Sequence, residues 1–234
     1  MKNKTLLTIC ASALVGLSMG ATVAMAYTAA GGGIVGSKHD MNQWVANGDP
    51  YQRVCAYCHT PHHAIKSDVL DYNPLWAHTL NESVTFSKYQ SASLNASITD
   101  PLVGPSRLCM SCHDGVIAID QHYSIDGGMV KTGDNFGNIA VANGQGDLSN
   151  DHPIGFDYAA VAAADRGIRP PTSGFRNNPQ GLKINDTLTN GIMTCATCHE
   201  VHNKDNVADA KQSYNYFIYA PERNSDICLS CHDK

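Results

Sequence analysis

The chain has 234 residues, of which 43% are hydrophobic and 16% charged, and its formal net charge is −5 with histidine counted as neutral. It has no basic stripe, so nucleic acid and anionic membrane surfaces are poor candidates for its partners. Nine cysteines and eleven histidines remain as the residue types whose arrangement carries the chemistry.

Residues 1–26 have the pattern of a secretory signal peptide, with two lysines near the start, a short apolar run and small residues before the cleavage site. The apolar run is short for a membrane span, which needs about 20 residues. We therefore expect a mature chain that starts at Tyr27, lies outside the cytoplasm and has no transmembrane segment. Cys10 leaves with the signal peptide, so the mature chain keeps eight cysteines.

The segment 27–53 opens the mature chain and contains its first histidine, His39. Glycines at 31–33 predict a flexible or extended lead-in. We therefore expect His39 on an arm that can reach away from the rest of the subunit.

The pattern Cys-x-x-Cys-His, which attaches c-type haem, then occurs four times. Two thiols add to the two vinyl groups of one porphyrin, and the histidine that follows binds the iron. We predict four covalently bound c-type haems (haem c, iron) on eight cysteines, with one motif histidine on each iron. The anchors are Cys55, Cys58, Cys109, Cys112, Cys195, Cys198, Cys228 and Cys231, and the ligands are His59, His113, His199 and His232.

Zinc and disulfides are the two alternatives for these cysteines. Zinc also binds C-x-x-C pairs, but it does not need a histidine after each pair, and only the last two pairs approach the spacing of a zinc ribbon. Disulfides occur in exported proteins, but they would leave the four adjacent histidines unexplained.

Seven further histidines can supply the second ligand of each iron. His62 and His202 both lie three residues after a motif histidine, on the same face of a continued helical turn, so each should bind the iron of a different haem. His152 precedes a proline that favours an extended approach. We predict His39, His62, His152 and His202 as the second ligands.

Other residues are left without this role. His63, His78 and His122 are expected to be haem-propionate partners or exposed, and His78 is the first substitute if a predicted ligand fails. Methionine is the rival ligand type and would raise the reduction potential, but histidine is abundant enough to favour two imidazoles on each iron. The candidate methionines are Met41, Met110, Met129 and Met193.

Between the motifs the sequence predicts little regular structure. Residues 84–94 read as loop or weak strand, 114–120 as one short strand or turn, and 126–150 and 169–179 as loop. An alanine-rich stretch at 158–165 predicts a helix that ends before Gly167 and Pro170.

The expected fold is therefore that of a multihaem cytochrome c. Residues 27–234 form a single tetrahaem domain of mostly irregular chain, with short α-helices and few short strands, packed around a chain of four haems. About 50 residues for each haem are too few to build an ordinary apolar core around it, so folding should depend on haem attachment.

Several short sequences beside the motifs resemble the outer-surface multihaem c-type cytochromes of metal-reducing bacteria, above all their tetrahaem members that polymerise into filaments. They are His39-Asp40-Met41, the Cys-x-x-Cys-His-Thr-Pro-His at 55–62, Leu75-Trp76, the stretch 108–115 and His152-Pro153-Ile154-Gly155. The resemblance implies a homopolymer that is a conductive extracellular nanowire. It also implies that His39, at the position of an N-terminal ligand in such filaments, binds a haem of the adjacent subunit.

Electron transfer without substrate chemistry is the function that these features favour. Irons with two imidazoles have no position open to substrate, so we expect no enzyme activity, and the partners are other cytochromes or extracellular electron acceptors. A soluble periplasmic electron shuttle is an alternative, and a multihaem oxyanion reductase, which needs an open iron, is a less favoured one. A single chain of a filament should hold three sites with two facing imidazoles and one that lacks its second imidazole.

Overall fold

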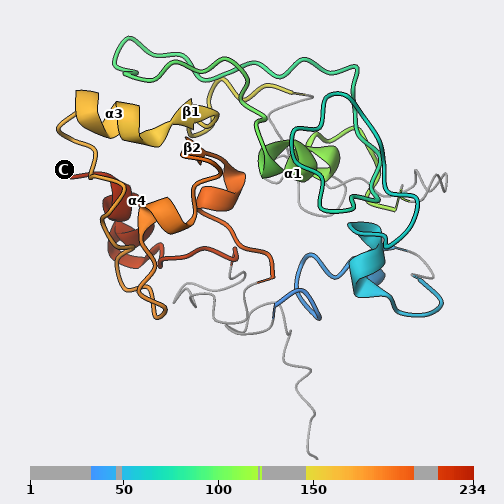
Figure 1. Cartoon of the computed structure of the whole chain (residues 1–234). Helices are drawn as coiled ribbons and strands as arrows, with labels where there is room; N and C mark the ends of the chain where they lie inside the picture. The colour runs from blue at the N-terminus through green and yellow to red at the C-terminus, as the bar shows by residue number, and fades with distance from the viewer. Residues whose placement is uncertain (1–32, 46–48, 121, 123–145, 203–215) are drawn as a thin grey trace, which may run out of the picture.

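The computed structural model describes residues 33–45, 49–120, 122, 146–202 and 216–234 (Figure 1). The predicted signal peptide, most of the predicted loop 126–150 and Met129 lie outside the described residues. Most of the described chain is loop and turn, which confirms the mostly irregular fold expected from the sequence.

The regular elements are short. The α-helices are α1 (Pro105–His113), α3 (Tyr158–Ala164) and α4 (Asp226–Cys231), and one antiparallel pair joins β1 (Phe156–Asp157) to β2 (Ile192–Met193). Single 3₁₀ turns lie at Met41–Gln43, Val54–Tyr57, Ile184–Asp186, Cys195–Thr197 and Arg223–Ser225.

Helix α3 confirms the helix predicted from the alanine-rich stretch. Alanine is the strongest helix former, and the side chain of Asp157 caps the helix by accepting a hydrogen bond from the Ala160 amide at 2.9 Å. The helix ends at Ala164, and its C-cap Asp165 lies two residues before Gly167. Residues 114–120, predicted as a strand or turn, form turns and bends.

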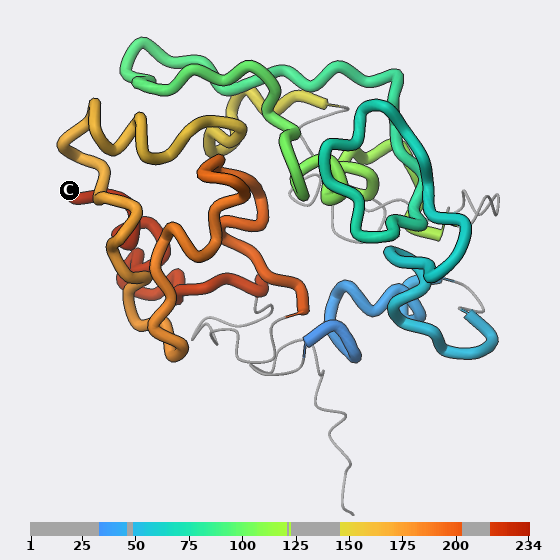
Figure 2. Tube along the Cα trace, in the orientation of Figure 1, coloured from blue at the N-terminus to red at the C-terminus, as the bar shows by residue number. Residues whose placement is uncertain are grey.

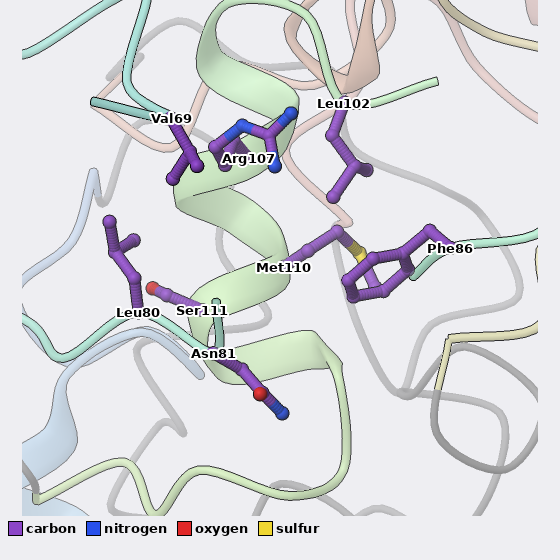
Figure 3. Close-up of a pocket in the computed structure, with 8 residues that line it drawn as sticks. All are labelled: Val69, Leu80, Asn81, Phe86, Leu102, Arg107, Met110 and Ser111. Carbon is purple, nitrogen blue, oxygen red and sulfur yellow. The ribbon is translucent and has the colours of Figure 1, made fainter. Parts of the chain in front are cut away.

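Helix α1 presents two different faces. Proline at its first position suits a helix start, because its missing amide would have no partner there. Arg107, Met110 and Ser111 share one face and, with side chains of neighbouring loops, line a small pocket (Figure 3). Cys109, Cys112 and His113 lie on the opposite side of the helix, so helix packing leaves the haem motif on the other face.

The largest apolar cluster lies in the C-terminal half of the chain. Its buried members are Ile98, Phe156, Tyr158, Phe175, Ile184, Met193, Tyr219, Ala220 and Cys231. Figure 2 shows an extended stretch before α1 that runs along one edge of the molecule to reach this half. Leu94 and Ala96 pack on the cluster, and Asn95 donates a hydrogen bond to Asp165 at 3.3 Å.

Two smaller clusters lie beside the first two haem motifs. One contains Met41, Tyr57 and Ile119, and the other contains Leu102, Met110 and Leu148. The buried apolar side chains that the structure describes thus form separate clusters and no single large core, as expected from the small number of residues for each predicted haem. Within the described residues, no helix is both long and apolar enough to cross a membrane.

Candidate haem sites

Each motif lies in a tight turn that brings its histidine back over its first cysteine. The first and third motifs begin in 3₁₀ turns, and the second and fourth lie at the ends of α1 and α4. The backbone amides of His59, His199 and His232 donate to the carbonyls of their first cysteines at 2.8, 3.1 and 2.9 Å. This turn places two sulfur atoms and one imidazole on the same side of the chain, as thioether attachment requires.

The eight motif cysteines are free thiols, so the structure does not support the disulfide alternative for them. Zinc sites take four protein ligands. Among the residues that the structure describes, no three His, Cys, Asp or Glu side chains gather as a metal site. A haem iron needs only two protein ligands, because the porphyrin supplies the other four.

The four motifs are neighbours in chain order. Cys58 of the first motif and Cys112 of the second pack against the same small cluster. Helix α1, which carries the second motif, contacts the turn Cys195–Thr197 of the third motif, and the neighbouring thiol of Cys109 lowers the pKa of Cys195. The cysteines of the third and fourth motifs adjoin in the C-terminal cluster, which contains Cys198 and Cys231. The candidate haem sites therefore form a row from first to fourth.

Three motif histidines face a second histidine. The ring centroids of His39 and His113 are 6.0 Å apart, those of His59 and His202 are 6.0 Å apart, and those of His152 and His232 are 6.2 Å apart. An imidazole nitrogen binds a transition metal at about 2 Å, so two rings on opposite sides of one iron have centroids about 6 Å apart. The spacing of all three pairs therefore fits one iron between two imidazoles.

The outer nitrogens of these rings are held in the way that metal-binding histidines require. Nδ1 of His59 lies 2.8 Å from the Pro74 carbonyl, Nδ1 of His199 lies 2.7 Å from the Tyr216 carbonyl, and Nδ1 of His152 lies 3.0 Å from the Pro153 carbonyl. A histidine that donates from Nδ1 presents the lone pair of Nε2, and such second-shell acceptors are typical of metal ligands.

Burial favours the neutral form of several of these rings, which is the form that binds a metal. The pKa of His39 is lowered to about 3, mainly by burial and also by the nearby rings of His113 and His199. Burial also lowers the pKa of His152, His199 and His232. His202 differs, because its hydrogen bond to Glu200 raises its pKa.

The structure places His39 differently from the free arm expected from the sequence. His39 lies against His113 of its own chain, and its ring also contacts Phe217 with centroids 5.2 Å apart. Its segment is folded by local hydrogen bonds, in which the amide of Gly36 donates to Asp40 and the indole of Trp44 donates to the Lys38 carbonyl. His39 is therefore within reach of an iron inside one subunit.

His199 is the one motif histidine that no described histidine faces. Its ring makes a hydrogen bond to the Tyr216 carbonyl, and no ring contact joins it to another imidazole among the residues that the structure describes. His62, predicted as a second ligand, is exposed together with His63 and is not brought to any motif histidine of its own chain. Within the part of the chain that the structure describes, three motif histidines thus face a second histidine and His199 does not.

His78 and His122 are structural residues rather than exposed ones. His78 is fully buried, and its two ring nitrogens lie 3.0 Å from the Thr79 carbonyl and 2.9 Å from the Ala118 carbonyl. Among the described residues, the structure places His78 against these carbonyls and not opposite a motif histidine. His122 packs on Tyr57 with ring centroids 4.6 Å apart. Met41, Met110 and Met193, the rival ligands within the described residues, are buried in apolar clusters.

The sequence predicts no role for two side chains that lie beside the candidate sites, Trp76 and Glu200. The indole nitrogen of Trp76 is buried without a hydrogen-bond acceptor, and its ring meets the edge of His59 with centroids 5.5 Å apart. A haem carries acceptors in its propionates, so an unpaired N–H beside an iron ligand fits such a group. The carboxylate of Glu200 lies 2.8 Å from Nδ1 of His202. The one sequence signal for Glu200 is its position between His199 and His202, the two histidines of the repeated Cys-x-x-Cys-His-x-x-His pattern.

The cysteine and histidine donors, the spacing of the facing rings and the unpaired indole of Trp76 together fit c-type haem.

Comparison with known proteins agrees with this geometry. No family model matches the chain. The chain is similar to the C-type polyheme cytochrome OmcC of Geobacter sulfurreducens, with 29% identity over 163 residues that cover 56% of this chain and 19% of the relative. The match spans less than a fifth of the relative's length. Together with four haem-attachment motifs, it supports a multihaem c-type cytochrome with covalent haem that functions in electron transfer.

Proposed function

We propose that this protein conducts electrons through four c-type haems as the subunit of an extracellular filament, without enzyme activity of its own. The observation that carries the proposal is the set of three facing imidazole pairs along a row of adjacent motifs. Bound haem supplies reversible one-electron oxidation and reduction. The cysteines fix each haem, and paired imidazoles close both faces of the iron to substrates.

The histidine without a facing partner supports assembly of subunits. Every second ligand predicted from the sequence faces a motif histidine of the same chain except His62, which is exposed. Among the described residues, the motif histidine that faces no second imidazole is His199. A subunit that is complete at three sites and incomplete at the fourth is the pattern expected of a filament. We infer that His62 of a neighbouring subunit completes the site of His199.

The surface around His62 suits contact with a second copy. Its loop exposes Val69, Tyr72 and Leu75, whose exposed fractions are 40%, 45% and 55%. An open hollow beside these residues is lined by His63, Ala64, Ile65, Lys66, Asn73 and Leu75. Large exposed apolar side chains close together mark interaction surfaces. The resemblance had pointed to His39 as the ligand that crosses between subunits, but this role would require His39 to leave His113.

Electron microscopy and absorption spectroscopy of single-histidine variants test this proposal. We expect His62→Ala to remain as separate particles in which one iron of four is high-spin. His63→Ala is the matched control and should form filaments in which every iron is low-spin. His39→Ala should keep filaments but contain a high-spin iron. Filaments of His62→Ala with only low-spin iron would refute the role of His62, and loss of filaments in His39→Ala would restore the role that the resemblance assigns to His39.

The uncompleted site of His199 also supports a second candidate function, that of a multihaem oxyanion reductase. An iron with an open position binds small anions. Wild-type protein that changes its absorption spectrum when nitrite is added would favour the reductase. Wild-type protein that gives only separate particles with four low-spin irons would favour a soluble periplasmic shuttle.

A further inference from the structure

The three facing pairs differ in what holds the second ligand on its outer side. Nδ1 of His202 lies 2.8 Å from a carboxylate oxygen of Glu200, and the backbone amide of His202 donates to the same oxygen at 2.9 Å. Nδ1 of His152 instead meets the backbone carbonyl of Pro153 at 3.0 Å. Nδ1 of His39 is buried and has no acceptor. The acceptor at Nδ1 is thus a charged carboxylate for His202 and a neutral carbonyl for His152, and His39 has none among the described residues.

This difference has an electronic consequence at an iron. A carboxylate that accepts the Nδ1 proton makes the imidazole a stronger electron donor than a neutral carbonyl does, because negative charge is drawn onto the ring. A stronger donor stabilises ferric iron over ferrous iron and lowers the reduction potential. A ring without an acceptor is the weakest donor of the three.

The two hydrogen bonds to one oxygen also fix the ring of His202. Glu200 follows the motif histidine His199 directly, so the third motif positions the residue that holds a ligand of the first site. The side chain of Glu200 is 39% exposed. Water screens its charge over longer distances, so the hydrogen bond itself carries the effect.

We propose that Glu200, acting through His202, makes the site of His59 and His202 the most reducing of the three sites with facing imidazoles. The proposal rests on the proposed function, because it requires haem between these rings. Glu200 is a positioning residue in this scheme and does not touch the iron. Electrons would then reach the first site only from a strong donor and would leave it downhill toward the second.

Redox titration of the full holoprotein tests the role of Glu200. Glu200→Gln keeps an oxygen acceptor and removes the charge, so one quarter of the total reduction amplitude, at the low-potential end of the curve, should move to higher potential. One of the low-spin ferric signals in electron paramagnetic resonance should shift with it. Glu200→Asp keeps the carboxylate and should restore part of the wild-type potential.

Glu82→Gln is the matched control, because it removes the same charge from an exposed carboxylate elsewhere on the chain. An unchanged curve for Glu200→Gln, a shift at the high-potential end or an equal shift in Glu82→Gln would overturn the inference. The haem content separates it from the proposed function. Four haems per chain without a shift refute the role of Glu200 alone, whereas a chain without haem refutes both.

Discussion

The environment of each ring nitrogen separates the histidines that suit iron from those that do not. His59, His152, His199 and His202 each engage Nδ1 with a carbonyl or carboxylate oxygen, whereas both ring nitrogens of His78 lie within hydrogen-bond distance of a carbonyl. Identical side chains therefore differ in function because of the backbone atoms around them. The amino-acid type alone contains no such information.

This distinction predicts opposite effects of two substitutions. His78→Ala removes a buried imidazole whose single N–H donates to one of two nearby carbonyls, and it should cost about 1–3 kcal/mol of unfolding free energy, while all four haems keep their wild-type absorption spectrum. Urea unfolding and visible spectroscopy measure the two quantities. His63→Ala, at an exposed position, should change the stability by less than about 0.5 kcal/mol. A high-spin iron in His78→Ala would show that His78 is a ligand after all.

Asp49 gives a prediction for low pH. It accepts hydrogen bonds from Nε and Nη2 of Arg53 at 2.9 and 2.7 Å, and these bonds are the main reason that its pKa falls from 3.8 to about 2. Because the pKa is lowered by folding, the carboxylate stabilises the fold above pH 4 and loses this effect as the pH falls toward 2. Asp49→Asn should have a lower Tm than the wild type at pH 7, and the difference should shrink between pH 4 and pH 2. A difference that is equal at both ends of this range would contradict the assignment.

The haem-attachment motifs are evident in the sequence, but which histidines face one another is not. Thioether chemistry fixes the spacing of two cysteines and a histidine, so the motif is local. Facing rings come from distant segments, as with His59 and His202. The shared offset of His62 and His202 suggested equal roles, but their surroundings differ. Beside His62, a proline and the left-handed backbone of His63, with φ of 60°, turn the chain outward, while Glu200 holds His202.

At the scale of elements, short helices and turns depend on a few close backbone contacts. Helix α3 could be predicted because alanine content and a capping aspartate act locally. The contact between residues 94–98 and the C-terminal cluster could not, because it joins segments far apart in the chain. Gly155, which precedes β1, lies where the chain passes residues 100–101.

Gly155 allows a matched prediction on this contact. A Cβ at Gly155, where φ is +80°, would lie 2.2 Å from the Asp100 carbonyl oxygen, whereas a Cβ at Gly181, where φ is +67°, would have no atom within 4 Å. Gly181→Ala should cost about 1–2 kcal/mol from the left-handed backbone alone. Gly155→Ala should cost clearly more, because the backbone of Asp100 must also move. Equal losses of Tm in the two variants would show that the backbone of Asp100 moves away from residue 155 at little cost in stability.

At the scale of the whole molecule, the motifs lie next to one another in the order in which they occur in the chain. The sequence predicts their number and not their neighbours, because neighbours depend on contacts such as that between Cys109 and Cys195.

The pairing of His59 with His202 has a consequence for how the molecule is assembled in the cell. A chain that emerges N-terminus first exposes the first anchor early, but the second imidazole of that site arrives only after the third anchor has followed. Under the proposed function, the site of the first anchor would therefore be among the last to gain both of its imidazoles. Haem bound between His59 and His202 would tie the beginning of the polypeptide to a segment synthesised much later.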